Sequence, residues 1–307
     1  MITRRDAIRM AATMAAMATV SLAATATAPA IIRRAIPSSG EAIPVIGMGT
    51  SRTFDVAADA ENVAALGQVM EAFFAGGGSV IDSSPMYGQA ESRVGDVLRA
   101  LSPRPPVFSA TKVWTRGRDE GIAQMQQSAR RMDVSRFDLI AVHNLVDWKT
   151  QLATLKRWKE EGKVRYLGIT TSHGRAHEEL LDIMRDTALD FVQFTYNIDN
   201  LSAEERLLPM AADRGIAVMI NRPFQRGALF SRSRGQPLPE VAQDLGCHSW
   251  GQFYLKFIIG HPAVTCLIPA TSKAHHMQDN MGANTGAVPD AAQRKEMLRA
   301  FAALPRQ

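Results

Sequence analysis

Short apolar runs alternate with longer amphipathic segments along most of the chain. Eight runs rich in Val, Ile, Ala and Phe lie at residues 45–49, 79–82, 107–112, 139–144, 166–171, 191–197, 216–221 and 265–270. Such nearly continuous apolar runs are typical of strands that are buried on both faces. Each run precedes a segment whose apolar residues recur at helical spacing. The pattern therefore predicts eight units, each a strand followed by a helix.

Eight such units favour a closed (β/α)8 barrel (TIM barrel) of parallel strands over an open, doubly wound sheet. We expect one α/β barrel domain over residues 31–307, although a chain of 307 residues is long enough for two domains. Residues 225–246 interrupt the rhythm after the seventh strand. We expect this insertion to form a loop and a short helix over the barrel mouth, where it would contribute to substrate selection.

The first thirty residues do not follow this rhythm. A basic head with Arg4 and Arg5 precedes a mildly apolar stretch and small residues that end at Ala30. This order predicts a signal peptide that is cleaved after Ala30, and its paired arginines resemble the twin-arginine type, which an export receptor reads. We therefore expect the export machinery as a partner and a periplasmic protein, with a retained signal that acts as a tether as the alternative. No later segment approaches about 18 uninterrupted apolar residues, so we expect no membrane span in the mature chain.

The net charge of +5 does not indicate nucleic-acid binding. Arg4, Arg5 and Arg9, set against Asp6, contribute +2 of it, so the chain from residue 31 onward carries +3. The basic residues that remain alternate with acidic ones and form no stripe that could follow a phosphate backbone. An oxidising compartment would allow Cys247 and Cys266 to pair, and the sequence leaves that question open.

Three ionisable residues stand where predicted strands end. Asp82 ends the second strand, Lys112 the third and His143 the fourth, at separations of 30 and 31 residues. The carboxyl ends of the strands of such a barrel meet at one mouth, so we expect the three side chains to face one another there. Perturbed ionisable groups that converge in this way are typical of a catalytic site.

Four motifs resemble the aldo-keto reductase family along nearly the whole chain after residue 30. They are IDSSPMYG (81–88), SATK (109–112), AVHN (141–144) and IPATSKAHHMQDNMGA (268–283). The resemblance implies a catalytic tetrad of Asp82, Tyr87, Lys112 and His143, and an NADP(H)-dependent oxidoreductase that acts on a small carbonyl substrate. Tyr87 would donate the proton, Lys112 would favour its release, Asp82 would keep Lys112 charged, and His143 would bind the carbonyl.

The same resemblance implies which residues hold NADP(H). Thr271, Ser272 and Lys273 would bind the adenosine phosphate at a helix start. His276, Asp279 and Asn280, which follow in the sequence, would lie at the adenine. Gln193 would bind the nicotinamide amide. The chain departs from the family pattern at two places. It has Thr170 and Thr171 in place of Ser-Asn, and Asn221 in place of an aromatic residue that stacks on the nicotinamide ring. Arg222 would compensate for the lost stacking by pairing with the pyrophosphate.

Two other functions are compatible with the sequence. A metal-assisted hydrolase would use Asp82, His143 and His173, but His173 and His177 lack a third ligand in sequence, and we expect no metal site. An exported NADP(H)-binding redox sensor or partner module with little turnover is the alternative to the reductase. The physiological substrate, the reaction direction, the oligomeric state and the recycling of an exported cofactor stay open.

Overall fold

The computed structural model describes residues 30–305, so the predicted signal peptide lies outside the described residues. A sheet of eight parallel strands runs in the order β3-β4-β5-β6-β7-β8-β9-β10. Its strands are β3 (Met48–Gly49), β4 (Val80–Asp82), β5 (Phe108–Val113), β6 (Phe137–His143), β7 (Val164–Thr170), β8 (Phe191–Thr195), β9 (Ala217–Asn221) and β10 (Cys266–Leu267). Parallel bridges that pair Ile46 with Leu267 and Gly49 with Ala270 join its two edges. The predicted (β/α)8 barrel is thus confirmed.

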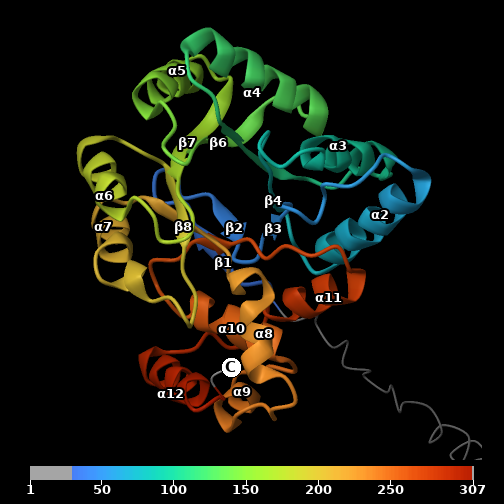
Figure 1. Ribbon diagram of the computed structural model, residues 1–307, viewed down its shortest axis with the longest axis vertical. Helices are drawn as coiled ribbons and strands as arrows, with labels where there is room; N and C mark the ends of the chain where they lie inside the picture. The colour runs from blue at the N-terminus through green and yellow to red at the C-terminus, as the bar shows by residue number, and fades with distance from the viewer. Residues whose placement is uncertain (1–29, 306–307) are drawn as a thin grey trace, which may run out of the picture.

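Helices follow the strands and surround them as a ring in which α2 to α7 and α11 are seen around the sheet (Figure 1). The helices are α2 (Ala60–Ala75), α3 (Ala90–Ala100), α4 (Arg118–Met132), α5 (Trp148–Glu160), α6 (His177–Asp186), α7 (Leu207–Asp213), α8 (Ala228–Ser233), α9 (Glu240–Asp244), α10 (Trp250–Ile259), α11 (Ala274–Gly282) and α12 (Ala291–Ala302). Short 3-10 turns lie at Ser202–Glu204 and Gln225–Gly227. The larger of two apolar clusters fills the space between the strands and these helices.

A β-hairpin that the sequence analysis did not predict fills the amino end of the barrel. Its strands β1 (Arg33–Ala35) and β2 (Ala42–Pro44) pair antiparallel across a turn. Ile36 and Ile43 pack in one buried cluster with residues from the starts of the barrel strands, among them Phe108 and Phe191. Strands of three residues are too short to show a period of two, so only the turn residues before Gly40 could have revealed them.

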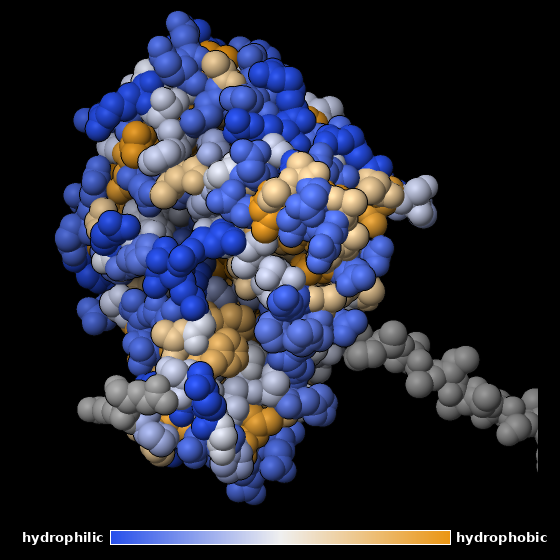
Figure 2. All heavy atoms as spheres, turned by 45° about the vertical axis from the view of Figure 1, so that its right-hand side comes forward, coloured by the Kyte–Doolittle hydropathy of each residue, from blue (hydrophilic) through white to orange (hydrophobic). Residues whose placement is uncertain are grey.

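The insertion after β9 contains two short helices, α8 and α9, rather than one. Both cysteines are buried and free of disulfide bonds. Within residues 30–305, no helix combines the length and the apolar character that a bilayer span requires. On the face drawn in Figure 2, hydrophilic side chains predominate and hydrophobic ones form smaller patches between them.

Candidate active site

The carboxyl ends of the strands surround a cavity of about 1310 Å³. Its wall includes Asp82, Tyr87 and His143, and residues that follow β3, β7, β9 and β10 complete it. A barrel places its ligand site at this end because every strand and its following loop converge there. The cavity is therefore the candidate active site.

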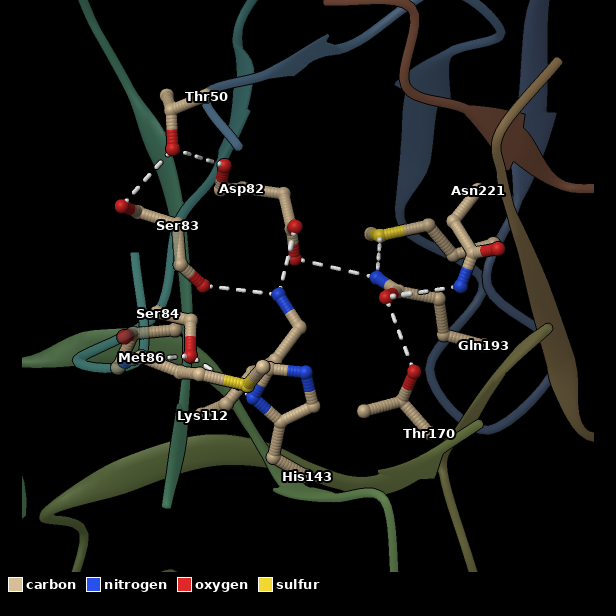
Figure 3. A network of polar contacts seen from close by, with 12 residues as sticks. Thr50, Asp82, Ser83, Ser84, Met86, Lys112, His143, Thr170, Gln193 and Asn221 are labelled. Atoms are coloured by element: carbon tan, nitrogen blue, oxygen red, sulfur yellow. Dashed lines mark hydrogen bonds and ion pairs between the residues drawn. The ribbon is translucent and has the colours of Figure 1, made fainter. Parts of the chain in front are cut away.

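Asp82 and Lys112 form a buried ion pair at the inner end of this cavity. The Lys112 Nζ donates hydrogen bonds to Asp82 Oδ2 at 2.7 Å and to the Ser83 carbonyl oxygen at 2.8 Å (Figure 3). Both side chains are almost completely shielded from solvent. Burial lowers the pKa of Lys112, but the Asp82 carboxylate raises it by its charge and by a hydrogen bond, and the pKa is raised overall. Lys112 is therefore a fixed ammonium.

Tyr87 reaches the cavity because the chain turns back directly after β4. Its backbone N–H donates to the Ser84 carbonyl oxygen at 3.0 Å, which closes the turn. The Lys112 Nζ lies 5.1 Å from the centre of the Tyr87 ring, and the His143 ring meets it edge-on at 5.7 Å. The structure thus brings together the four residues predicted as the tetrad.

The pKa of Tyr87 is raised, although Lys112 acts on it in the direction that the sequence analysis expected. Burial raises this pKa, whereas the Lys112 ammonium lowers it by its charge and a hydrogen bond. Burial has the larger effect, so the phenol keeps its proton at neutral pH. Lys112 moderates the effect of burial on Tyr87 rather than producing a phenolate.

His143 lies at the end of β6 with only 5% of its surface exposed. Its Nδ1 lies 2.9 Å from the Ser84 Oγ. Burial lowers its pKa, the nearby Lys112 charge lowers it further, and the value falls to about 3. The imidazole is therefore neutral at physiological pH.

Amide and hydroxyl groups form a second network beside Asp82. The Gln193 Nε2 donates to Asp82 Oδ1 at 3.1 Å, and its Oε1 accepts from Thr170 Oγ1 at 3.0 Å. Asn221 donates to the Thr171 carbonyl oxygen at 2.9 Å and accepts from the Thr195 hydroxyl at 2.7 Å. These contacts fix three predicted cofactor ligands, Thr170, Gln193 and Asn221, at the cavity wall. Thr171 is buried behind the cavity wall, and only its backbone carbonyl takes part in this network.

The other predicted cofactor ligands, apart from Arg222, lie in α11 and in the three residues before it. Four of them line the cavity, namely Thr271, His276, Asp279 and Asn280. Asp279 is also held by the Ser249 hydroxyl at 2.7 Å, which ties α11 to α10. Ser272 and Lys273 are exposed beside the cavity and are not part of its wall.

A basic cluster that the sequence analysis largely missed occupies one side of the cavity. His173, Arg175 and Arg226 line it together with the predicted Arg222. Ion pairs within residues 30–305 involve none of these arginines. Burial lowers the pKa of Arg222, and the charges of Arg226 and Arg175 lower it further.

Two nitrogens of Arg222, Nε and Nη1, are buried without a hydrogen-bond partner among the described residues. Unpaired, mutually repelling guanidinium groups around a large cavity fit a ligand with phosphate oxygens. His173 lies in the loop before α6, and His177 is the first residue of that helix. Only the position of His173 after a strand end could have marked it as a cavity residue.

Aromatic residues form another part of the cavity wall. Phe224, Phe230 and Trp250 line the cavity, and the rings of Phe224 and Phe230 lie 5.0 Å apart. Phe230 comes from α8, within residues 225–246, so the insertion contributes to the cavity wall, whereas Trp250 comes from α10 beyond it. An apolar lining with a few hydrogen-bonding groups is typical of a small-molecule site.

Comparisons with known proteins agree with this geometry. The model of the aldo/keto reductase family matches residues 45–296. Methylglyoxal reductase YeaE of Escherichia coli is 27% identical over 260 residues, which are 81% of this chain and 88% of that protein. L-galactose dehydrogenase of Arabidopsis thaliana is 24% identical over 282 residues, or 82% of this chain and 88% of that one.

Solved structures show the same fold. The aldo-keto reductase of Klebsiella pneumoniae in complex with NADPH has a TM-score of 0.73 at 22% identity, and the match covers 90% of this chain and 97% of that one. The glycerol dehydrogenase AKR11B4 of Gluconobacter oxydans has a TM-score of 0.73 at 18% identity, with 88% and 95% covered. Because the family model matches most of the sequence, the chain belongs to the aldo-keto reductase family.

Proposed function

We propose that the protein reduces an aldehyde or ketone to an alcohol with NADP(H), and that Tyr87 donates the proton. The observation that carries this proposal is the meeting of Tyr87, His143 and the Lys112–Asp82 pair at one cavity. This arrangement offers a protonated phenol, a neutral imidazole and a fixed positive charge at a single place. Reduction of a carbonyl needs these groups because negative charge develops on its oxygen.

Each side chain has a distinct part in the proposed reaction. When bound, NADPH would supply a hydride, whose electron pair forms the new C–H bond at the carbonyl carbon. His143 holds the carbonyl oxygen by a hydrogen bond. Tyr87 gives its proton to this oxygen, which completes the alcohol, and the Lys112 ammonium stabilises the phenolate that is left. Asp82 raises the pKa of Lys112 against the effect of burial and so keeps it charged.

Two features support NADP(H) as the cofactor. The basic cluster of His173, Arg175, Arg222 and Arg226 suits the pyrophosphate, and exposed Lys273 lies before α11, where it can pair with the additional phosphate of NADP(H). The Klebsiella relative was solved with NADPH, which supports the same choice. The alternative of an NADP(H)-binding module with little turnover finds no favouring observation, since the proton-donating groups are assembled around the cavity.

The substrate we propose is a small carbonyl compound. Its carbonyl oxygen would face Tyr87 and His143, and its remainder would lie against the aromatic wall of Phe224, Phe230 and Trp250. Methylglyoxal, the compound in the name of the Escherichia coli relative, is a small carbonyl of this kind and belongs in the first substrate panel.

The Tyr87→Phe variant tests the proposed function. We expect it to lose at least about 100-fold in turnover with NADPH and an aldehyde panel, because the general acid is gone, while NADPH affinity stays nearly unchanged. Tyr166→Phe is the matched control, since the Tyr166 hydroxyl binds Ser39 and Glu41 at the other end of the barrel. Full turnover in Tyr87→Phe, or no turnover in the wild-type protein, would contradict the proposal.

A further inference from the structure

The hydroxyl of Ser84 has two hydrogen-bond contacts within the described part of the chain, and together they determine which group its O–H can donate to. Ser84 is fully buried, between Asp82 and the exposed Met86. Its Oγ accepts a hydrogen bond from the Met86 backbone N–H at 3.2 Å. The other hydrogen-bond partner of Ser84 Oγ among residues 30–305 is His143 Nδ1, at 2.9 Å. Figure 3 shows the Ser84 hydroxyl beside the imidazole ring.

A neutral imidazole carries its proton on Nδ1 or on Nε2, and the two forms place different demands on Ser84. If Nδ1 carried the proton, Ser84 Oγ would accept from both Nδ1 and Met86, and its own buried O–H would have no acceptor among the described residues. Folded proteins rarely leave a buried donor unused. If Nδ1 is bare, the Ser84 O–H donates to it and all three groups are satisfied.

The protonated imidazolium does not fit this position either. It would carry a hydrogen on both ring nitrogens, and Nδ1 would again leave the Ser84 hydroxyl without an acceptor. It would also be a buried cation near the Lys112 ammonium, and both burial and that charge lower the pKa of His143. The neutral ring with a bare Nδ1 is the form that the surroundings favour.

We propose that Ser84 is a positioning residue, whose hydroxyl holds His143 in the form with its proton on Nε2. His143 lines the cavity, and Ser84 occupies Nδ1, so Nε2 is the nitrogen that faces a ligand. Nε2–H then donates to the substrate carbonyl oxygen, whereas a bare Nε2 would repel it. This inference rests on the proposed function for its catalytic consequence, but the proton position itself does not depend on it.

Nitrogen NMR of the histidine-labelled full-length protein, without cofactor or substrate, measures the proton position directly. The His143 signals are assigned by their absence in His143→Gln. We expect Nδ1 of the wild-type protein to resonate as an unprotonated nitrogen and Nε2 as an N–H. In Ser84→Ala both nitrogens should shift toward averaged values, and Ser84→Thr, which keeps a hydroxyl, should restore the wild-type pattern.

Ser83→Ala is the matched control for the NMR experiment. Ser83 is the adjacent buried serine, and its hydroxyl contacts Thr50 instead of His143, so we expect the His143 signals to stay unchanged. A wild-type protein with its proton on Nδ1 would overturn the proposal, and so would a Ser84→Ala variant with wild-type signals. Neither result depends on catalytic activity.

Kinetics with the best aldehyde found and NADPH complete the test. We expect Ser84→Ala to lower kcat/KM roughly fivefold to tenfold, with NADPH affinity unchanged and recovery in Ser84→Thr. Wild-type kcat/KM in a Ser84→Ala variant whose NMR signals are averaged would overturn the catalytic consequence. A wild-type protein with the expected NMR pattern but no carbonyl reduction would reject the proposed function and leave the position of the proton established.

Discussion

At the scale of single residues, burial sets the chemistry of the site more strongly than neighbouring charge does for Tyr87 and His143. Burial holds the Tyr87 proton in place and keeps His143 neutral, and it also lowers the pKa of Lys112, an effect that the Asp82 carboxylate opposes. Of these three groups, it is chiefly Lys112 that needs an ion-pair partner to hold its protonation state against burial. Removal of one partner from a buried pair leaves an uncompensated charge, which proteins tolerate poorly.

His143 predicts how stability depends on pH. Its pKa is about 3 in the folded protein against 6.5 ordinarily, so between these values the unfolded chain binds a proton that the folded chain does not. The free energy of unfolding should therefore fall with falling pH in this window, by up to about 1.4 kcal/mol per pH unit from this group. Urea unfolding of wild type and His143→Gln from pH 7 to pH 4 measures this, and the free energy of unfolding of wild type minus that of the variant should fall as pH falls. Parallel curves would contradict the assignment.

The sequence predicted part of the site for a physical reason that is visible at these residues. Asp82, Lys112 and His143 lie at or next to strand ends, and parallel strands bring such ends together whatever the details of the loops. Tyr87 lies five residues past its strand, so only the resemblance to a family indicated it. The roles of Ser84 and Arg226 depend on contacts between separate loops, for which local sequence carries no signal.

At the scale of elements, close contact between neighbouring helices restricts which side chains are possible. A Cβ on Gly95 of α3 would lie 1.9 Å from the Arg131 carbonyl oxygen of α4. The two helices can approach this closely only because residue 95 has no side chain. Short strands such as β1 and β2 escaped the sequence analysis, whereas α10 was predictable because its apolar run is long.

A pair of glycine substitutions tests this packing. Gly95→Ala should lower the free energy of unfolding by about 1–3 kcal/mol, because the added methyl group forces α3 and α4 apart. Gly67→Ala in α2 should raise it by up to about 1 kcal/mol, since nothing lies within 4 Å of its Cβ position and alanine favours a helix. Thermal and urea unfolding measure both changes. Equal effects of the two substitutions would mean that helix propensity alone acts at residue 95.

At the scale of the whole molecule, the eight-unit rhythm made the barrel predictable, because each parallel strand must be buried by the helices on its outer side. The hydrophobic pattern could not show how the amino end is closed. We also propose that the chain is exported to the periplasm by its first thirty residues, on the evidence of their sequence alone.

Cell fractionation tests the proposed export. We expect the periplasmic protein to begin at Ile31, and the double substitution of Arg4 and Arg5 by Lys to leave the full-length chain in the cytoplasm, because the export receptor reads the paired arginines. Mass spectrometry of the intact protein from each fraction gives the first residue. Wild-type protein that keeps Met1 in the cytoplasm would refute export, and uncleaved protein on the membrane would indicate a tether.

The hairpin of β1 and β2 closes the amino end of the barrel. Ile36 and Ile43 fill that end, so a ligand can reach Gln193 and Thr170 only through the opening at the carboxyl ends of the strands. A molecule whose reactive end reaches those two residues has to enter before anything that sits nearer the opening, and has to depart after it. We therefore expect binding and release to be ordered, with the molecule at Gln193 and Thr170 binding first and leaving last.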